Sequence, residues 1–130
     1  MAFTGKVTVQ IAESGRTISG VMSREADGKY AASVSVPAST TNKQVEANFT
    51  FADAEIVFLK SDKDVTLYTN APSTGVPADT IVLKAGVPKF YVKDGGMTNL
   101  FTANVTAIYL TNAGNSAALV DIVVLNDVTP

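Results

Sequence analysis

Paired carboxylates are the side chains of this 130-residue chain that come closest to a catalytic arrangement. Asp53 and Glu55 lie two residues apart, as do Asp62 and Asp64. Residues two apart share one face of a β-strand, and two converging carboxylates can hydrolyse a glycosidic bond. Both pairs nevertheless lie in predicted turns, and the chain has no tryptophan to form a sugar-binding platform. We therefore interpret both pairs as solvated turn residues and predict no catalytic dyad.

Metal and phosphate binding are the next chemistries that these residue types could support. Asp62-Lys63-Asp64 lacks the acidic spacing and final glutamate of an EF-hand calcium loop. Asp94-Gly95-Gly96 is typical of a turn, and no Lys-Ser/Thr pair follows it as in a phosphate-binding loop. We predict no metal site and no cofactor.

Histidine and cysteine are both absent from the chain. Histidine is the usual general base near neutral pH, and the cysteine thiolate is the strongest side-chain nucleophile. A serine or threonine nucleophile would need a lysine base, and the chain contains neither Ser-x-x-Lys nor Gly-x-Ser-x-Gly. We expect no catalytic residue and do not expect an enzyme.

The charge pattern argues against nucleic acid and membrane surfaces as partners. The formal net charge is −2, and the ten basic residues are scattered singly between Lys6 and Lys93. Proteins that bind nucleic acid or anionic lipid usually concentrate Lys and Arg in one run or on one face. Charged residues make up 17 % of the chain, whereas an average soluble domain has roughly 25 %. This low charge indicates that another subunit covers part of the surface, so we expect a homo-oligomer.

The cellular location can be addressed from cysteine usage and from the N-terminal segment. Without cysteine, folding cannot depend on an oxidising compartment. The first residues alternate in polarity rather than forming a secretory signal, and no apolar run approaches the ~20 residues that span a bilayer. We expect synthesis and folding in the cytoplasm.

Period-2 alternation of apolar and polar residues dominates the chain and indicates β-strands. Clusters of Gly, Pro, Asn and Asp separate these short segments, which is typical of a sandwich or a barrel. The length fits a single domain over residues 1–130. Strands are predicted over residues 6–11, 17–23, 30–36, 45–51, 56–59, 65–69, 80–83, 87–92, 105–111 and 118–125.

Four local predictions concern how these strands are arranged. Asp27-Gly28 predicts a tight hairpin turn, and residues 38–43 predict a polar loop. Residues 52–55 predict a helical turn. The strand at residues 118–125 carries a single charge, whereas edge strands usually carry several, so we expect it to be central or capped by a partner.

An internal similarity links two parts of the second half. Thr69-Asn70-Ala71 followed by residues 79–83 matches Thr111-Asn112-Ala113 followed by residues 121–125 without gaps. Two explanations remain open. The two units are either equivalent hairpins stacked in the two sheets of one sandwich, or hairpins that converged on a similar composition.

The second half of the chain contains a series of segments with a distinctive order and composition. They are Val65-Thr66-Leu67-Tyr68-Thr69-Asn70, Ala78-Asp79-Thr80-Ile81-Val82-Leu83, Val87-Pro88, Gly95-Gly96-Met97-Thr98 and residues 104–112. Through these segments, residues 64–125 resemble a family of small β-sandwich proteins that decorate, or cement, the capsids of tailed bacteriophages. The resemblance implies an antiparallel, jelly-roll-like β-sandwich of about 8–10 short strands. It further implies a protein of the virion surface, made in the host cytoplasm, that oligomerises and bridges neighbouring subunits of the major capsid protein.

Bridging by such a protein needs apolar patches, free strand edges or an extended arm that adds to a neighbouring sheet. Two arms are predicted, an N-terminal one over residues 1–11 and a C-terminal one over residues 126–130. The apolar run at residues 56–59 is a third candidate, although burial in the core is its more ordinary fate. Candidate interface residues are Phe3, Val7, Val9, Ile11 and Val128.

A carbohydrate- or receptor-binding β-sandwich of a phage fibre or tail is the alternative function. Such a module would use the loops at residues 71–79 and 93–99. An aromatic side chain exposed on those loops would favour it. The first loop has none, and the second depends on its neighbours Tyr91 and Phe101.

Overall fold

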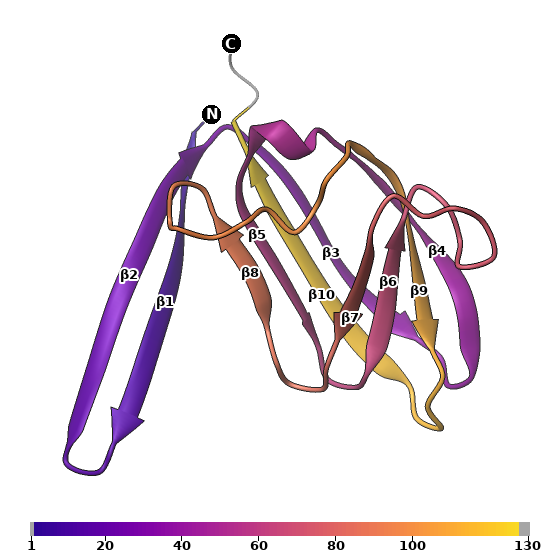
Figure 1. Ribbon diagram of the computed structural model, residues 1–130, viewed down its shortest axis with the longest axis horizontal. Helices are drawn as coiled ribbons and strands as arrows, with labels where there is room; N and C mark the ends of the chain where they lie inside the picture. The colour runs from indigo at the N-terminus through magenta and orange to yellow at the C-terminus, as the bar shows by residue number, and fades with distance from the viewer. Residues whose placement is uncertain (1, 128–130) are drawn as a thin grey trace.

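The computed structural model describes residues 2–127 and is almost entirely β-structure (Figure 1). Two four-stranded antiparallel sheets pack as a sandwich, and a separate two-stranded hairpin projects from one end of it. Within residues 2–127, no helix is long and apolar enough to cross a membrane. The strands are β1 (Phe3–Glu13), β2 (Arg16–Ala26), β3 (Gly28–Val36), β4 (Thr40–Phe49), β5 (Ala54–Ser61), β6 (Val65–Thr69), β7 (Thr80–Leu83), β8 (Lys89–Val92), β9 (Val105–Asn112) and β10 (Ala118–Asn126), with a 3-10 turn η1 (Phe51–Asp53) before β5.

The strand order describes one long hairpin that has been rolled up. β6 pairs with β7, β5 with β8, β4 with β9 and β3 with β10, so the chain doubles back on itself around the β6–β7 connection. Additional pairing of β10 with β5 and of β9 with β6 closes two sheets. We call the sheet β3-β10-β5-β8 sheet I and the sheet β4-β9-β6-β7 sheet II.

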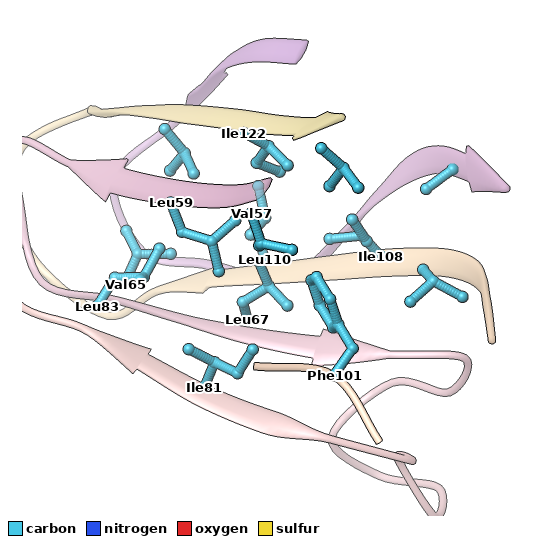
Figure 2. Packing of buried hydrophobic residues seen from close by; sticks show 14 of the residues in the cluster. Val57, Leu59, Val65, Leu67, Ile81, Leu83, Phe101, Ile108, Leu110 and Ile122 are labelled. Carbon is cyan, nitrogen blue, oxygen red and sulfur yellow. The ribbon is translucent and has the colours of Figure 1, made fainter. Parts of the chain in front are cut away.

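The core lies between the two sheets and follows from the period-2 alternation of their strands. Every second residue of each strand points inward, where aliphatic side chains from both sheets meet (Figure 2). Phe101, from the loop before β9, closes one part of the core edge-on to Phe49, with ring centroids 5.3 Å apart. The largest fully buried side chains include Val57, Leu59, Leu67, Leu83, Ile108, Leu110 and Ile122.

Several sequence predictions are confirmed. The fold is an all-β antiparallel sandwich, and each predicted strand is present within a few residues of its expected bounds. The strand at residues 118–125 is central, because β10 lies between β3 and β5. The run at residues 56–59 lies in β5, where Val57 and Leu59 are fully buried in the core. The helical turn predicted at residues 52–55 is present only in part, since η1 covers Phe51–Asp53 and Ala54 and Glu55 already belong to β5.

The predicted hairpin turn at Asp27-Gly28 is wrong. β2 pairs with β1, whereas β3 pairs with β10, so these residues form a crossover between the hairpin and sheet I. The Asp27 N–H donates to the Asn126 carbonyl (3.0 Å), and Gly28 is registered with Asn126 at the end of β10. The predicted loop at residues 38–43 is also too long, because β4 already begins at Thr40.

The two similar units of the second half are not equivalent hairpins. β6 and β7 pair in sheet II, but β9 lies in sheet II and β10 in sheet I. What the units share is an asparagine whose side chain donates to backbone carbonyls of other segments. Asn70 donates to the Asn104 carbonyl (2.8 Å), and Asn112 donates to the carbonyls of Val36 (3.1 Å) and Ser116 (2.8 Å).

Two neighbouring residues of β7 give a direct test of this architecture. Leu83 is fully buried between the sheets, whereas Val82 points outward and is 44 % exposed. Leu83→Ala should lower the free energy of unfolding by about 2–5 kcal/mol, because it removes buried methyl groups and leaves a cavity. Val82→Ala should cost less than about 1 kcal/mol. Urea unfolding followed by circular dichroism checks both values, and equal costs would contradict the assigned faces.

Candidate functional site

The hairpin formed by β1 and β2, residues 3–26, is the most unusual part of the molecule, and we call it the hairpin arm. Across residues 2–127, these two strands pair only with each other, and they extend away from the sandwich (Figure 1). Their register runs without a break from Phe3↔Ala26 to Glu13↔Arg16. Gly15 closes the turn with φ +87°, a conformation that glycine adopts without steric cost.

One face of the hairpin arm is apolar from its base to near its tip. Residues directly opposite each other in an antiparallel pair project to the same face, so the pairs Val7↔Met22 and Ile11↔Ile18 lie on one side. The opposite face, which includes Thr8 and its partner Val21, is mostly polar. We call the apolar face the stripe; it consists of Phe3, Val7, Val9, Ile11, Ile18, Met22 and Ala26.

The base of the stripe packs on the outer face of sheet I. There Val7 and Ala26 are buried against a row that crosses three strands of the sheet. Phe3 and Met22 are half-buried around them. We call this contact the base cluster; its fully packed members are Val7, Ala26, Ile56, Val92 and Leu125.

Gly5 allows the close approach of β1 to the sheet. A Cβ atom at this position would overlap the end of the Leu125 side chain and would lie 2.9 Å from Cδ1 of Ile56. A larger residue would have to displace the ends of these two side chains, whereas glycine lets the strand backbone rest on them as they stand. The glycine therefore sets how close the arm lies to sheet I at its base.

An ion-pair network fixes the other strand of the arm to sheet I. The Arg24 guanidinium donates from Nε to Oε2 of Glu55 (3.0 Å) and approaches the Asp94 carboxylate at 3.7 Å. Lys93 Nζ lies 3.8 Å from the other Glu55 oxygen. The Glu55 side chain is only 5 % exposed, so its charge is compensated mainly by these two cations. The network holds β2 against β5 and the loop that follows β8.

The distal part of the stripe has no such contact. Val9, Ile11 and Ile18 are 42 %, 64 % and 54 % exposed, and we call these three residues the distal stripe. The chain thus presents large aliphatic side chains on a projecting element, continuous with a face that is buried at its base. An exposed apolar patch on an ordered element is typical of an interaction site.

The outer face of sheet I carries a second apolar row beside the base cluster. Val123 is registered with Ala31 on one side and with Phe58 on the other, and Phe58 is registered with Phe90. The Phe58 and Phe90 rings stack with centroids 6.4 Å apart. We call these four residues the outer row. Two hollows border it, one of about 430 Å³ over Ala31 and Phe58 and one of about 270 Å³ between β1 and the sheet.

The structure separates the predicted interface residues into three groups. Phe3 and Val7 face the chain's own sheet I and pack against it. Val9 and Ile11 remain exposed. Val128 lies outside the described residues. The predicted N-terminal arm at residues 1–11 includes most of β1, which is hydrogen-bonded to β2 rather than free; of the C-terminal arm, Asn126 ends β10 and Asp127 donates to the Asp53 carbonyl (2.8 Å).

Sequence reasoning missed the second strand of the arm as part of the site. Ile18 and Met22 belong to the stripe, yet residues 16–26 alternate weakly because Gly20 and Arg24 occupy the same face. Of the outer row, only Phe58 lay in a candidate interface segment, the run at residues 56–59. The other three residues were missed, because Val123 lies in a nearly continuous apolar segment and Ala31 and Phe90 are placed beside it only by the strand pairing. A segment in which both the odd and the even positions are apolar indicates a strand that is covered on two faces.

The carboxylate pairs serve structural roles. Asp62 accepts the Leu119 N–H (2.8 Å), and Asp64 accepts the Ala85 N–H (2.9 Å). The Ala85 N–H and the nearby Lys84 ammonium hold the pKa of Asp64 below its ordinary value. The prediction that Glu55 lies in a solvated turn is wrong, because Glu55 is buried in β5. In the described part of the chain, no group of three or more Asp or Glu residues is arranged to hold a metal ion.

The aromatic side chains that the carbohydrate-binding alternative would need point inward. Phe101 is buried in the core, and Tyr91 is half-buried and packs against it. Neither ring is presented on the loop at residues 93–99. This arrangement does not favour glycan stacking on that loop.

Comparisons of the chain with protein-family models, with curated proteins and with solved structures found no match. The hairpin arm and the outer face of sheet I are therefore the features of the molecule that point to a function.

The close approach at Gly5 predicts a large effect of adding a side chain there. Gly5→Thr should lower the free energy of unfolding by about 1–3 kcal/mol, because it overfills the contact with Ile56 and Leu125. Gly20→Thr is the matched control, since a Cβ at Gly20 of the same arm meets no atom within 4 Å. Chemical unfolding and limited proteolysis of the arm measure the difference. Equal behaviour of the two variants would show that the base cluster does not hold the arm.

The ion-pair network predicts that Arg24 matters more than an exposed cation. Arg24→Ala should cost about 1–3 kcal/mol, because the buried Glu55 carboxylate loses its main hydrogen-bond donor. Lys84→Ala, which breaks the exposed Lys84–Asp64 pair, is the control and should leave the unfolding midpoint nearly unchanged. A larger loss for Lys84→Ala than for Arg24→Ala would contradict the role given to the network.

Proposed function

We propose that this protein is a structural virion protein that binds the outside of a phage capsid and stabilises it by bridging neighbouring major capsid protein subunits. It acts as a homo-oligomer, dimer or trimer, without catalysis, nucleic acid or membrane. The observation that carries the proposal is the distal stripe of the hairpin arm. A rigidly anchored arm that exposes Val9, Ile11 and Ile18 is suited to reach another subunit.

The energy available from the arm fits a bridging role. Full burial of one aliphatic side chain contributes about 1.5–3 kcal/mol, and the three side chains of the distal stripe start partly covered. One arm can therefore supply a few kcal/mol, which is weak for a single contact. On a shell with many equivalent sites, copies that the arm joins bind far more tightly than a single copy, through their effective concentration.

The strand order supports the jelly-roll part of the resemblance. In a jelly roll, eight strands behave as a long hairpin wrapped into two four-stranded sheets, with the first strand beside the last. The pairs β3–β10, β4–β9, β5–β8 and β6–β7 follow this scheme. The hairpin arm precedes the eight strands, so its distal part can vary in its contacts without disturbing the sandwich.

Co-sedimentation with capsids of the phage that encodes the chain tests the proposal. The wild-type protein should pellet with the shells and raise their resistance to heat or low salt. Ile11→Asp should reduce the bound amount at least about tenfold, which corresponds to about 1.4 kcal/mol, because it places a charge in the distal stripe. Val76→Asp is the matched control, since Val76 is 90 % exposed on a loop of the sandwich.

A shortened arm gives a second, independent variant. Residues 8–21 are replaced by an Asn-Gly turn between Val7 and Met22, a pair of the same hydrogen-bonding type as the Glu13↔Arg16 pair that closes the native two-residue turn, so the base cluster is retained. This variant should fold and fail to pellet. Deleting residues 1–11 is a poorer test, because it removes β1 and uncovers Ile56 and Leu125. Full binding by both the shortened and the Ile11→Asp proteins would contradict the proposed role of the arm.

A further inference from the structure

Two apolar surfaces of this chain are each buried within the molecule over only part of their extent. The stripe of the hairpin arm is buried at its base and exposed in its distal part. The outer face of sheet I is covered at the row of Leu125, Ile56 and Val92, whereas the neighbouring outer row keeps Ala31 exposed and Val123, Phe58 and Phe90 only half-buried. Each surface therefore continues beyond the contact that they share.

The base cluster shows that these two surfaces fit each other chemically. Val7 of the stripe packs with Ile56 and Leu125 of the sheet, aliphatic against aliphatic. The distal stripe has the same kind of side chain, two and four residues further along the same face of β1. The outer row lies two residues further along β10 and β5 on the same face of sheet I. A contact between the distal stripe and an outer row thus extends an interface that the fold already contains.

The arm does not use its own outer row. Beyond the base it diverges from the sandwich (Figure 1), and its distal residues remain exposed. At the start of the divergence lies the hollow of about 270 Å³, lined by Gly5 and Val7 on the arm and by Phe58 and Val123 on the sheet. The Arg24–Glu55 bond and the close approach of Gly5 hold the arm in this direction.

We infer that a second copy of this chain covers both surfaces, the distal stripe of each copy docking on the outer row of the other about a two-fold axis. A second copy supplies one stripe and one row, so each exposed surface meets a partner of matching chemistry and equal number. Two-fold dimers are the commonest closed assemblies, and their interfaces are self-complementary in this way. The inference rests on the homo-oligomer part of the proposed function and names the two surfaces that meet: the arm joins copies of the chain, and the joined copies bind the capsid.

Site-directed cross-linking tests the contact directly, because the wild-type chain contains no cysteine. An Ile11→Cys chain is mixed with an affinity-tagged Ala31→Cys chain and treated with a short bismaleimide. The inference expects a covalent heterodimer that joins the arm of one copy to the outer row of the other. Thr8→Cys replaces Ile11→Cys as the control, since Thr8 is exposed on the opposite face of the same strand.

Mass measurement of the purified full-length protein provides the second readout. The wild-type chain should form a particle of twice its 13.6 kDa mass. Ile11→Asp on the arm and Ala31→Glu on the outer row should each return it to 13.6 kDa, whereas Val76→Asp should stay dimeric. All four chains should keep the same circular dichroism spectrum, because the three substituted residues are exposed.

Three results would overturn the inference. They are a wild-type monomer at every accessible concentration, an assembly that survives both Ile11→Asp and Ala31→Glu, and equal cross-linking from Thr8→Cys and Ile11→Cys. A monomer that still binds capsids through its arm rejects the two-fold contact but keeps the proposed function. A dimer with these properties that does not bind capsids supports the two-fold contact and contradicts the proposed function.

Discussion

The packing of the hairpin arm on the outer face of sheet I is the constraint on which the rest of the account depends. Gly5 brings the β1 backbone onto Ile56 and Leu125, and Arg24 ties β2 to the buried Glu55. These contacts turn a two-stranded ribbon, which would be marginally stable alone, into an ordered projection. The direction in which Val9, Ile11 and Ile18 are presented follows from that anchoring.

Sheet I can support the arm because its central strands are apolar on both faces. In β10, Val120, Ile122 and Val124 fill the sandwich core, while Val123 and Leu125 form the outer side. A sheet of an antiparallel sandwich more commonly has one solvated, polar face. Together with the low content of charged residues, the doubly apolar sheet supports the proposed assembly.

The sequence predicts the strands well and their connections less well. Alternation is a local property, so β3 and β6 to β10 could be located from it. The Asp27-Gly28 turn was wrong because the same dipeptide also suits a crossover, and only the long-range pairing of Gly28 with Asn126 distinguishes the two. Val9 and Ile11 were predicted as interface residues. Ile18 and the outer row other than Phe58 were not, since their faces depend on the β1–β2 register and on which strands flank β10.

Amide hydrogen exchange tests the central claim most directly, namely that the distal part of the arm is the surface another subunit covers. The measurement compares residues 9–20 with the amides of β9 in dilute protein, in concentrated protein and on the shell. The account predicts that exchange at residues 9–20 slows several-fold on assembly, whereas β9, at the centre of sheet II, is unchanged. Exchange at the arm that stays the same in all three states would contradict it.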